Sequence, residues 1–492
     1  MVEYKWKAFS VTSVGALMSA VDSTIVLLAL LPIAEELHTD YVTIVWVVVA
    51  YLLINTSLVL SLGRLADIQG RKKMYNVGFA IFTIGSALCG LAPSGLALVA
   101  FRALQGAGSA LIMANSFAII SDAFPHGERG KAFGMNMIVW GTGSVLGIIL
   151  GGVIISYTSW RLIFLINLPI GIFGTAWAYR ALVADAHGGN AIAPANGTGL
   201  RGGNSVRRTQ SFDIPAALSF TGALLVLQLG VTLGLLYSWT DTLALVSFGL
   251  FPVLLIFFVV WESRFSVQPI IDLKMFSGNR VFSVSVTSSM LQALALFSVN
   301  FLLLFYFEGV YGLSVLSSSY LLVPYAITSA VVGPFAGRLS DRLGARIVAS
   351  AGLAVQAVAL LLLSLLTLST PLLYVGAIEA FFGLGGALFW PSNTSTIMSA
   401  APKESYGTAS GILNTFRNTG MVMSFALSLT AATSVLPARI VSALYLGTFT
   451  GTLTHQYAVG YLSGQSFAFE LSAVLLAVSM CFSLLSGRVQ KK

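Results

Sequence analysis

The chain has 492 residues, of which 57% are hydrophobic and only 9% charged, and its mean hydropathy is +0.88. Soluble domains carry about 25% charged residues, so this composition excludes a water-soluble protein and predicts an integral membrane protein. No sequence of the form G-x-x-x-x-G-K-[ST] occurs, which argues against a nucleotide-driven pump. The four histidines are scattered through polar segments and predict no metal site, and both cysteines lie in apolar runs, which excludes a disulfide scaffold.

Fourteen apolar runs are long enough to cross a bilayer as helices, which takes about 20 residues each. The first run carries Asp22 and is too long for a signal peptide, so we expect it to be retained. The expected fold is therefore an all-α integral membrane protein with fourteen transmembrane helices. The predicted spans are 8–31, 43–62, 74–93, 95–121, 133–157, 161–183, 212–236, 241–262, 281–308, 315–337, 346–368, 371–398, 406–435 and 467–487.

The basic residues predict the orientation of these helices. Of 26 lysines and arginines, 22 lie in the two termini and in the loops on the same side of the membrane. The positive-inside rule then places both the N- and the C-terminus in the cytoplasm. This distribution explains the net charge of +8 without a nucleic-acid partner. The short tails suit a multi-pass protein of a prokaryotic plasma membrane, with residues 437–466 outside the cell.

A repeat divides the chain into two halves. Gly63-Arg-Leu-Ala-Asp67-Ile-Gln-Gly70-Arg71 recurs as Gly337-Arg-Leu-Ser-Asp341-Arg-Leu-Gly344, eight predicted helices later. A plain six-plus-six duplication gives an offset of six, so two extra helices are expected between the halves. Duplicated helical halves around a central cavity are typical of secondary transporters. The expected domains are a six-helix half at 1–183, a cytoplasmic linker at 184–211, two extra helices and a loop at 212–280, and a second six-helix half at 281–492.

Several separate motifs resemble those of the fourteen-helix drug:proton antiporter branch of the major facilitator superfamily. Motif A is the repeated segment that starts at Gly63, and motif B runs from Arg102 to Gly108. Three further segments are typical of this branch: Asp22 to Pro32, Trp160 to Gly171 and Gly407 to Arg417. The resemblance covers nearly the whole chain. It implies a major facilitator fold and transport by alternating access.

Asp22 draws attention because a carboxylate inside a membrane helix is costly and usually functional. It shares a helix face with Gly15, Met18 and Ser19, which predicts that this face lines a cavity. Arg102 lies about 9 Å and Asp22 about 14 Å below the outer surface at 1.5 Å per residue, so the two have similar depths. Burial favours the neutral form of a carboxylate, so Asp22 is the expected proton acceptor. The resemblance implies that Arg102 takes part in proton coupling. A structural ion pair is the alternative.

Motif A has a physical interpretation as a conformational latch. The resemblance implies that Asp67 faces the positive end of the helix that starts near Tyr406 and that Arg71 pairs with Asp122. Such contacts would hold the halves together in the outward-facing state. The alternative is a loop that only sets topology. The expected latch residues are Gly63, Asp67, Gly70, Arg71, Asp122 and, in the second copy, Asp341.

Polar residues within the later helices predict the substrate site. Glu379 shares a face with Trp390, Asn393 and several glycines, which suits a lipophilic cation through charge and cation–π attraction. The alternative is that the glycines serve close helix packing. Arg417 lies on a polar stripe that either lines the cavity or joins two helices. Glu308 either attracts cations or is a solvated helix end. The full expected set is Glu379, Trp390, Glu308, Asn393, Arg417, Asn414, Gln105 and Met113.

Two segments depart from the family pattern. Motif C keeps Gly143, Gly147, Gly151 and Gly152, but Ile148 stands where a proline is usual, so we expect a less kinked helix and a less strict antiport. The segment that follows Asp22 lacks the usual asparagine and is one residue longer than usual. The chemistry of the cavity is therefore expected to differ from that of common multidrug exporters.

The sequence predicts a proton-coupled exporter of amphipathic or cationic organic molecules, of the multidrug efflux type. It is not expected to be an enzyme, and it needs no cofactor because the proton gradient supplies the energy. Its expected partners are a small-molecule substrate, protons and the lipid bilayer, and it is expected to be a monomer. The alternatives are an exporter of a lipid or dedicated metabolite without strict proton coupling, and a membrane receptor that transports nothing.

Overall fold

A computed structural model describes residues 2–183, 213–236, 239–266, 276, 278–313, 315–402, 405–433, 436–437, 440 and 452–485. All regular elements that these residues form are helices. This is what a membrane-spanning chain requires, because a helix satisfies its backbone hydrogen bonds internally where no water is present. The predicted linker at 184–211 lies outside the described residues.

The first half contains six long helical segments. In chain order its elements are α1 (Val2–Ile25), η1 (Val26–Ala29), α2 (Leu30–Glu36), α3 (Tyr41–Gln69), α4 (Arg71–Gly90), α5 (Gly95–Ala123), η2 (His126–Glu128), α6 (Arg129–Tyr157), α7 (Arg161–Leu165) and α8 (Asn167–Ala181).

The remainder contains the two extra helices and the second half. These elements are α9 (Ile214–Leu236), α10 (Thr242–Arg264), α12 (Arg280–Phe305), the π-helical turn η3 (Tyr306–Val310), α13 (Val315–Leu343), α14 (Ala345–Ser364), α15 (Leu372–Ala400), α16 (Tyr406–Thr433) and α18 (His455–Leu485).

A helix occupies part of each of the fourteen predicted ranges. Within the described residues, eleven helical segments are long and apolar enough to cross a membrane. Two boundaries were wrong. The last helix begins at His455 and not at 467, so residues 455–466 are helical. Motif A is no loop, because α3 continues to Gln69 and the chain turns at Gly70, whose φ of +98° favours glycine.

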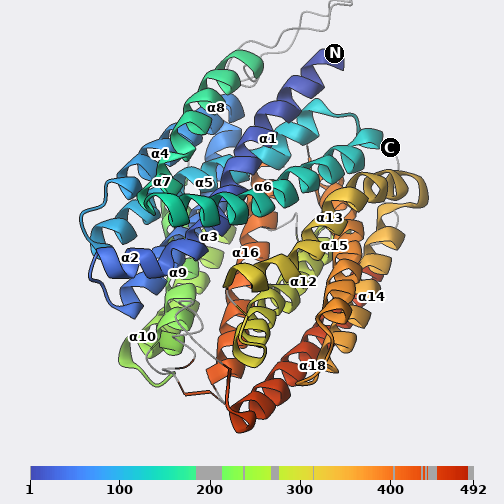
Figure 1. Cartoon of the computed structure of the whole chain (residues 1–492). Coiled ribbons are helices and arrows are strands. Elements are labelled where there is room, and N and C mark those ends of the chain that lie inside the picture. Colours follow the sequence, from blue (N-terminus) through green and yellow to red (C-terminus); the bar gives the residue numbers. More distant parts are fainter. Residues whose placement is uncertain are drawn as a thin grey trace, which may run out of the picture.

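The two halves meet through equivalent helices. The motif A helix of each half, α3 or α13, packs against the other half: α3 against α16 and α13 against α6. In Figure 1 the blue and teal helices of the first half lie beside the yellow to red helices of the second. The extra pair α9 and α10 packs at the side, where α9 contacts both α3 and α16. The interface between the halves thus follows the sequence repeat.

Candidate functional site

A buried cluster of polar side chains surrounds Asp22 on α1. One carboxylate oxygen accepts a hydrogen bond from Arg102 Nη1 on α5 at 2.8 Å, which is also an ion pair. The other oxygen accepts from Gln105 Nε2 at 2.9 Å and from Asn167 Nδ2 on α8 at 3.1 Å. The side chains of Asp22 and Arg102 are 0% and 2% exposed. The Asp22 carboxyl group is therefore fully buried and has three hydrogen-bond donors.

Arg102 is equally well satisfied. Its Nε donates to the Val47 carbonyl on α3 at 3.1 Å, and its Nη1 also donates to Gln105 Oε1 at 2.6 Å. The guanidinium lies 4.2 Å from the centre of the Tyr51 ring, a favourable cation–π distance. These contacts link α1, α3 and α5 within the first half. The similar depths predicted for the two charged groups thus correspond to a direct pair.

Two residues of this cluster were missed as site residues in the sequence. Ser86 on α4 accepts hydrogen bonds from Gln105 and Asn167 and donates to the Phe164 carbonyl at 2.9 Å. Asn167 belongs to the Trp160 to Gly171 motif, and a polar residue in that apolar segment was the available signal. Gln105, predicted for substrate binding, lies in this cluster and is fully buried.

A small cavity lies between the halves, one helical turn from Asp22. Its volume is about 20 Å³, roughly the room for one water molecule. Helices α1, α5 and α6 of the first half and α16 of the second form its walls. The lining residues are Ala16, Ser19, Ile112, Met113, Ser116, Phe117, Asn136, Trp140, Asn414 and Arg417.

Three of the predicted substrate residues, Met113, Asn414 and Arg417, therefore lie at one cavity. Ser410 and Asn414 of α16 each donate a hydrogen bond to the Met113 carbonyl on α5, at 3.4 Å. The Arg417 guanidinium lies 5.5 Å from the centre of the Trp390 ring. The polar stripe of α16 thus serves both purposes proposed for it, since it joins the halves and lines the cavity.

The other predicted substrate residues do not converge there. Glu379 is fully buried, and neither of its carboxylate oxygens has a hydrogen-bond partner among the described residues. Asn393 faces α12, where it donates to Ser289 Oγ at 2.6 Å. A Cβ on Gly383 would lie 2.5 Å from the Tyr325 carbonyl oxygen, so this glycine serves close packing of α15 against α13. In this structure Glu379 and Asn393 do not line the cavity, and their grouping with Trp390 around one ligand stays a prediction.

Glu308 is not a solvated helix end. It lies in the π-helical turn η3 and is only 4% exposed, and its Oε1 has no hydrogen-bond partner among the described residues. The sequence placed Glu308 at a helix end, but it lies in the π-helical turn that continues α12, where it is buried.

Motif A joins the halves at one end of the bundle. Asp67 on α3 accepts hydrogen bonds from the backbone N–H groups of Gly407 at 2.9 Å and Thr408 at 2.8 Å, at the first turn of α16. Arg71 pairs with Asp67 at 2.9 Å and also with Asp122. The carboxylate therefore lies at the positive end of the α16 dipole, as the resemblance implied.

The second copy of motif A makes the equivalent contact. Asp341 on α13 accepts from the backbone N–H groups of Gly130 and Lys131, at the first turn of α6. Glycines allow α3 to approach α16 closely, and α13 to approach α6. A Cβ on Gly63 would lie 2.6 Å from the Gly407 carbonyl oxygen, and a Cβ on Gly337 would lie 2.3 Å from the Gly130 carbonyl oxygen. This end of the bundle is closed by two related carboxylate contacts, one from each half.

Motif C glycines pack α6 against α1. A Cβ on Gly147 would lie 2.1 Å from Thr24 Oγ1, and one on Gly143 would lie 2.7 Å from the Ala20 side chain. The helix runs without a break from Arg129 to Tyr157, past Ile148 and Gly151. Close contact with the Asp22 helix is thus the role that these glycines have in the structure.

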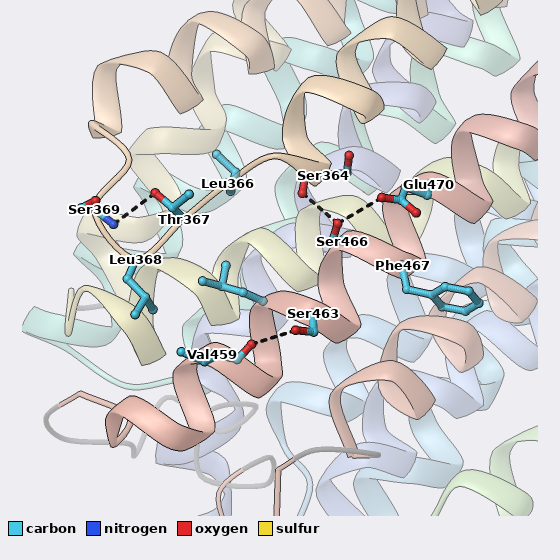
Figure 2. Close-up of a pocket in the computed structure, with 11 residues that line it drawn as sticks. Ser364, Leu366, Thr367, Leu368, Ser369, Val459, Ser463, Ser466, Phe467 and Glu470 are labelled. Atoms are coloured by element: carbon cyan, nitrogen blue, oxygen red, sulfur yellow. Dashed lines mark hydrogen bonds between the residues drawn. The ribbon is translucent and has the colours of Figure 1, made fainter.

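Figure 2 shows a larger hollow, of about 660 Å³, that opens at the surface of the second half. Ser466 of α18 joins two of its walls, since its hydroxyl donates to the Ser364 carbonyl on α14 at 2.8 Å; Glu470 Oε1 lies 3.3 Å from the same hydroxyl. Its walls are α14, α18 and the segment after α14. It lies within the second half, away from the interface between the halves.

Two helical halves with related sequence, a polar cavity between them and a buried ion pair define a membrane transporter. The Major Facilitator Superfamily family model matches residues 12–425, and the chain belongs to that family. It is 31% identical over 430 residues to the riboflavin transporter RibZ of Clostridioides difficile (strain 630), covering 87% of both chains. It is 31% identical over 418 residues to the multidrug resistance protein Stp of Mycobacterium tuberculosis (strain ATCC 25618 / H37Rv), covering 85% of this chain and 74% of Stp.

The fold is also that of solved transporters. The crystal structure of the human organic anion transporter MFSD10 (TETRAN) superposes with a TM-score of 0.63 at 15% identity, covering 96% of this chain and 99% of that one. At this identity the likeness concerns the fold alone. The protein is a multi-pass membrane transporter that binds a small molecule, and it is not an enzyme.

Proposed function

We propose that this protein is a proton-coupled exporter of amphipathic organic compounds, of the multidrug efflux type. The observation that carries the proposal is the Asp22–Arg102 pair, fully buried on membrane helices one turn from the cavity between the halves. A buried pair is weak evidence for stability, and an ionisable group in a membrane helix usually has a functional role. Relatives at about 30% identity that are named for multidrug resistance support the type of substrate.

Asp22 is proposed as the proton acceptor. Protonation removes its charge, so its attraction to Arg102 falls and Arg102 is left with the Gln105 and Val47 acceptors. Cluster residues come from α1, α4, α5 and α8, and α1 also packs against α6 at the cavity. A change in protonation therefore acts on the helices that line the cavity. The proton gradient is the proposed energy source, without a cofactor.

The motif A contacts are proposed as the latch of alternating access. In the state described here Asp67 and Asp341 each hold the first turn of a helix in the other half. With the proposed cytoplasmic termini, this closed end faces the cytoplasm and the state is closed to the inside. Release of both contacts opens the cavity inward. The remaining proposals from the sequence are fourteen spanning helices, the four-part domain division, the plasma membrane and a monomer.

A transport assay tests this function. The full chain is reconstituted in proteoliposomes that contain a pH-sensitive dye, and ethidium, riboflavin and fluorescein serve as cationic, neutral and anionic amphipathic probes. Proton movement that depends on the probe, and probe movement that depends on a pH gradient, are expected for at least one of them. Failure of every probe to move protons contradicts the proposal.

A second candidate is the export of one dedicated metabolite without strict proton coupling. The relative named as a riboflavin transporter favours it, since its match covers 87% of each chain. In the same assay, riboflavin transport at a rate that does not depend on the pH gradient supports this candidate.

A further inference from the structure

Arg417 carries a charge that the protein leaves uncompensated. It lies on α16 at the cavity between the halves and makes no ion pair or hydrogen bond with any residue in the described part of the chain, and its Nε is buried without a partner. None of the described residues that line the cavity is acidic. An unpaired cation in a low-dielectric site is costly, so a ligand that brings a negative charge gains more here than in water.

Two buried carboxylates of the membrane helices, Asp22 and Glu379, do not neutralise Arg417. Asp22 already accepts from Arg102, Gln105 and Asn167. Glu379 lies on α15 eleven residues before Trp390, the residue under the Arg417 guanidinium, which is about 16 Å along a helix. The cavity therefore keeps the positive charge of Arg417, because neither carboxylate pairs with it.

The same cavity contains further hydrogen-bond donors without acceptors. Asn136 Nδ2 on α6 and Ser19 Oγ on α1 are buried and have no partner among the described residues. The two side chains are 2% and 1% exposed. With Arg417 they present donors from three helices and from both halves. Buried donors left unpaired cost about 1–3 kcal/mol each, and a ligand with several acceptor oxygens removes that cost.

Aromatic side chains define the rest of the ligand. Trp140 and Phe117 line the cavity, and the face of Trp390 is already occupied by the guanidinium of Arg417 at 5.5 Å. The sequence predicts the Trp390 ring as a contact for a cationic substrate, but the Arg417 guanidinium already lies over that ring. Like charges disfavour a second cation beside it.

We infer that the central cavity binds aromatic compounds that carry a carboxylate or a comparable anionic group, with Arg417 as the residue that selects the charge. This inference rests on the proposed function and names its substrate class. In the closed state the cavity has room for about one water molecule, so binding accompanies separation of α16 from α1 and α6.

A matched pair of dyes tests the charge selection. Fluorescein and rhodamine 123 share a xanthene ring and carry opposite charges at pH 8. Their dissociation constants are measured by fluorescence anisotropy on the full chain in nanodiscs, for the wild type, Arg417→Gln, Arg417→Lys and a control, Arg264→Gln. Arg264 is an exposed arginine at the end of α10, away from the cavity. Melting temperatures show whether each variant folds.

The wild type is expected to bind fluorescein at least about tenfold more tightly than rhodamine 123, and Arg417→Gln to lose about 10- to 100-fold of that affinity, the worth of a hydrogen bond to a charged group. Arg417→Lys should lose less, and Arg264→Gln nothing. The inference is contradicted if the wild type and the folded Arg417→Gln variant bind fluorescein with equal affinity. It is also contradicted if neither of them binds fluorescein. Proton-linked export of rhodamine 123 in that case would still uphold the proposed function. Arg417-dependent fluorescein binding without proton-linked transport would contradict only the proposed function.

Discussion

The two halves of the molecule hold their buried charges in opposite ways. In the first half Asp22 has three donors and Arg102 has acceptors on three helices, all within one cluster. In the second half Glu379 has no partner for either oxygen among the described residues, and Arg417 has only an aromatic ring beside it. Such unequal treatment is not what a simple duplication of one ancestral half would give.

The difference separates two tasks. A charge pair that is fully satisfied within one half responds only to protonation, because every other partner is already in place. A charge without a partner at the interface of the halves responds to what enters the cavity. We therefore propose that the first half carries out proton coupling and that α16 of the second half recognises the ligand. Each of the following variants tests that division.

Asp22→Asn is expected to have the largest effect, the loss of proton-linked transport. Asparagine keeps the shape of the side chain but cannot gain or lose a proton, and it replaces one acceptor with a donor that faces Gln105 or Arg102. Proton flux in proteoliposomes and melting temperature in detergent measure the two consequences. A folded variant that still couples protons to export would move the proton site to the second half.

Arg102→Leu is expected to lower the free energy of unfolding by about 3–5 kcal/mol, because it leaves the Asp22 carboxylate buried and unpaired. The same substitution in an Asp22→Asn background should cost clearly less, since no unpaired charge remains. Denaturant unfolding of the four proteins measures this coupling. Equal costs in both backgrounds would show that the pair is not the source of the stability.

Asp67→Asn is expected to slow transport about tenfold, the worth of one charge-assisted hydrogen bond of the closed state. Asp341→Asn is the matched control in the second copy of motif A. The side chain of Asp67 is 2% exposed and also binds Arg71, while Asp341 is exposed. Asp341→Asn should therefore have the smaller effect. The two variants are compared by their transport rates at saturating probe. A wild-type rate in Asp67→Asn would show that motif A only sets the topology and does not act as a latch.

Glu379→Gln is expected to have the smallest effect, a change below about 1 kcal/mol in the free energy of unfolding. Neither carboxylate oxygen makes a hydrogen bond with a described residue, so glutamine removes no contact. Proton-linked transport should persist. If folded Glu379→Gln loses proton-linked transport, proton coupling belongs to the second half and not to the first.

The sequence predicted the parts of this structure that follow from local pattern. Apolar runs predicted the helices, and the repeated Gly-Arg-Leu-x-Asp segment predicted that Asp67 and Asp341 occupy equivalent places. Depth along a helix placed Asp22 near Arg102, because rise per residue is nearly constant.

What the sequence did not predict depends on how helices rotate against one another. Glu379 and Arg417 both lie on polar helix faces, yet only Arg417 faces the cavity. The glycines of α15 bring it against α13 at Tyr325, and Glu379 lies near Tyr325 and does not line the cavity. Asn167 was missed because its partner Asp22 lies 145 positions earlier in the chain. Side-chain partners between distant helices are set by packing, which no single helix encodes.

The most direct test of the division between the halves is proton release on ligand binding. Purified wild type, Asp22→Asn and Glu379→Gln are mixed with fluorescein, as the ligand, in weakly buffered detergent solution, and the pH is followed with an electrode. The account predicts that Glu379→Gln exchanges protons as the wild type does and that Asp22→Asn, although folded, exchanges none. Proton exchange that survives in Asp22→Asn and disappears in Glu379→Gln would contradict it.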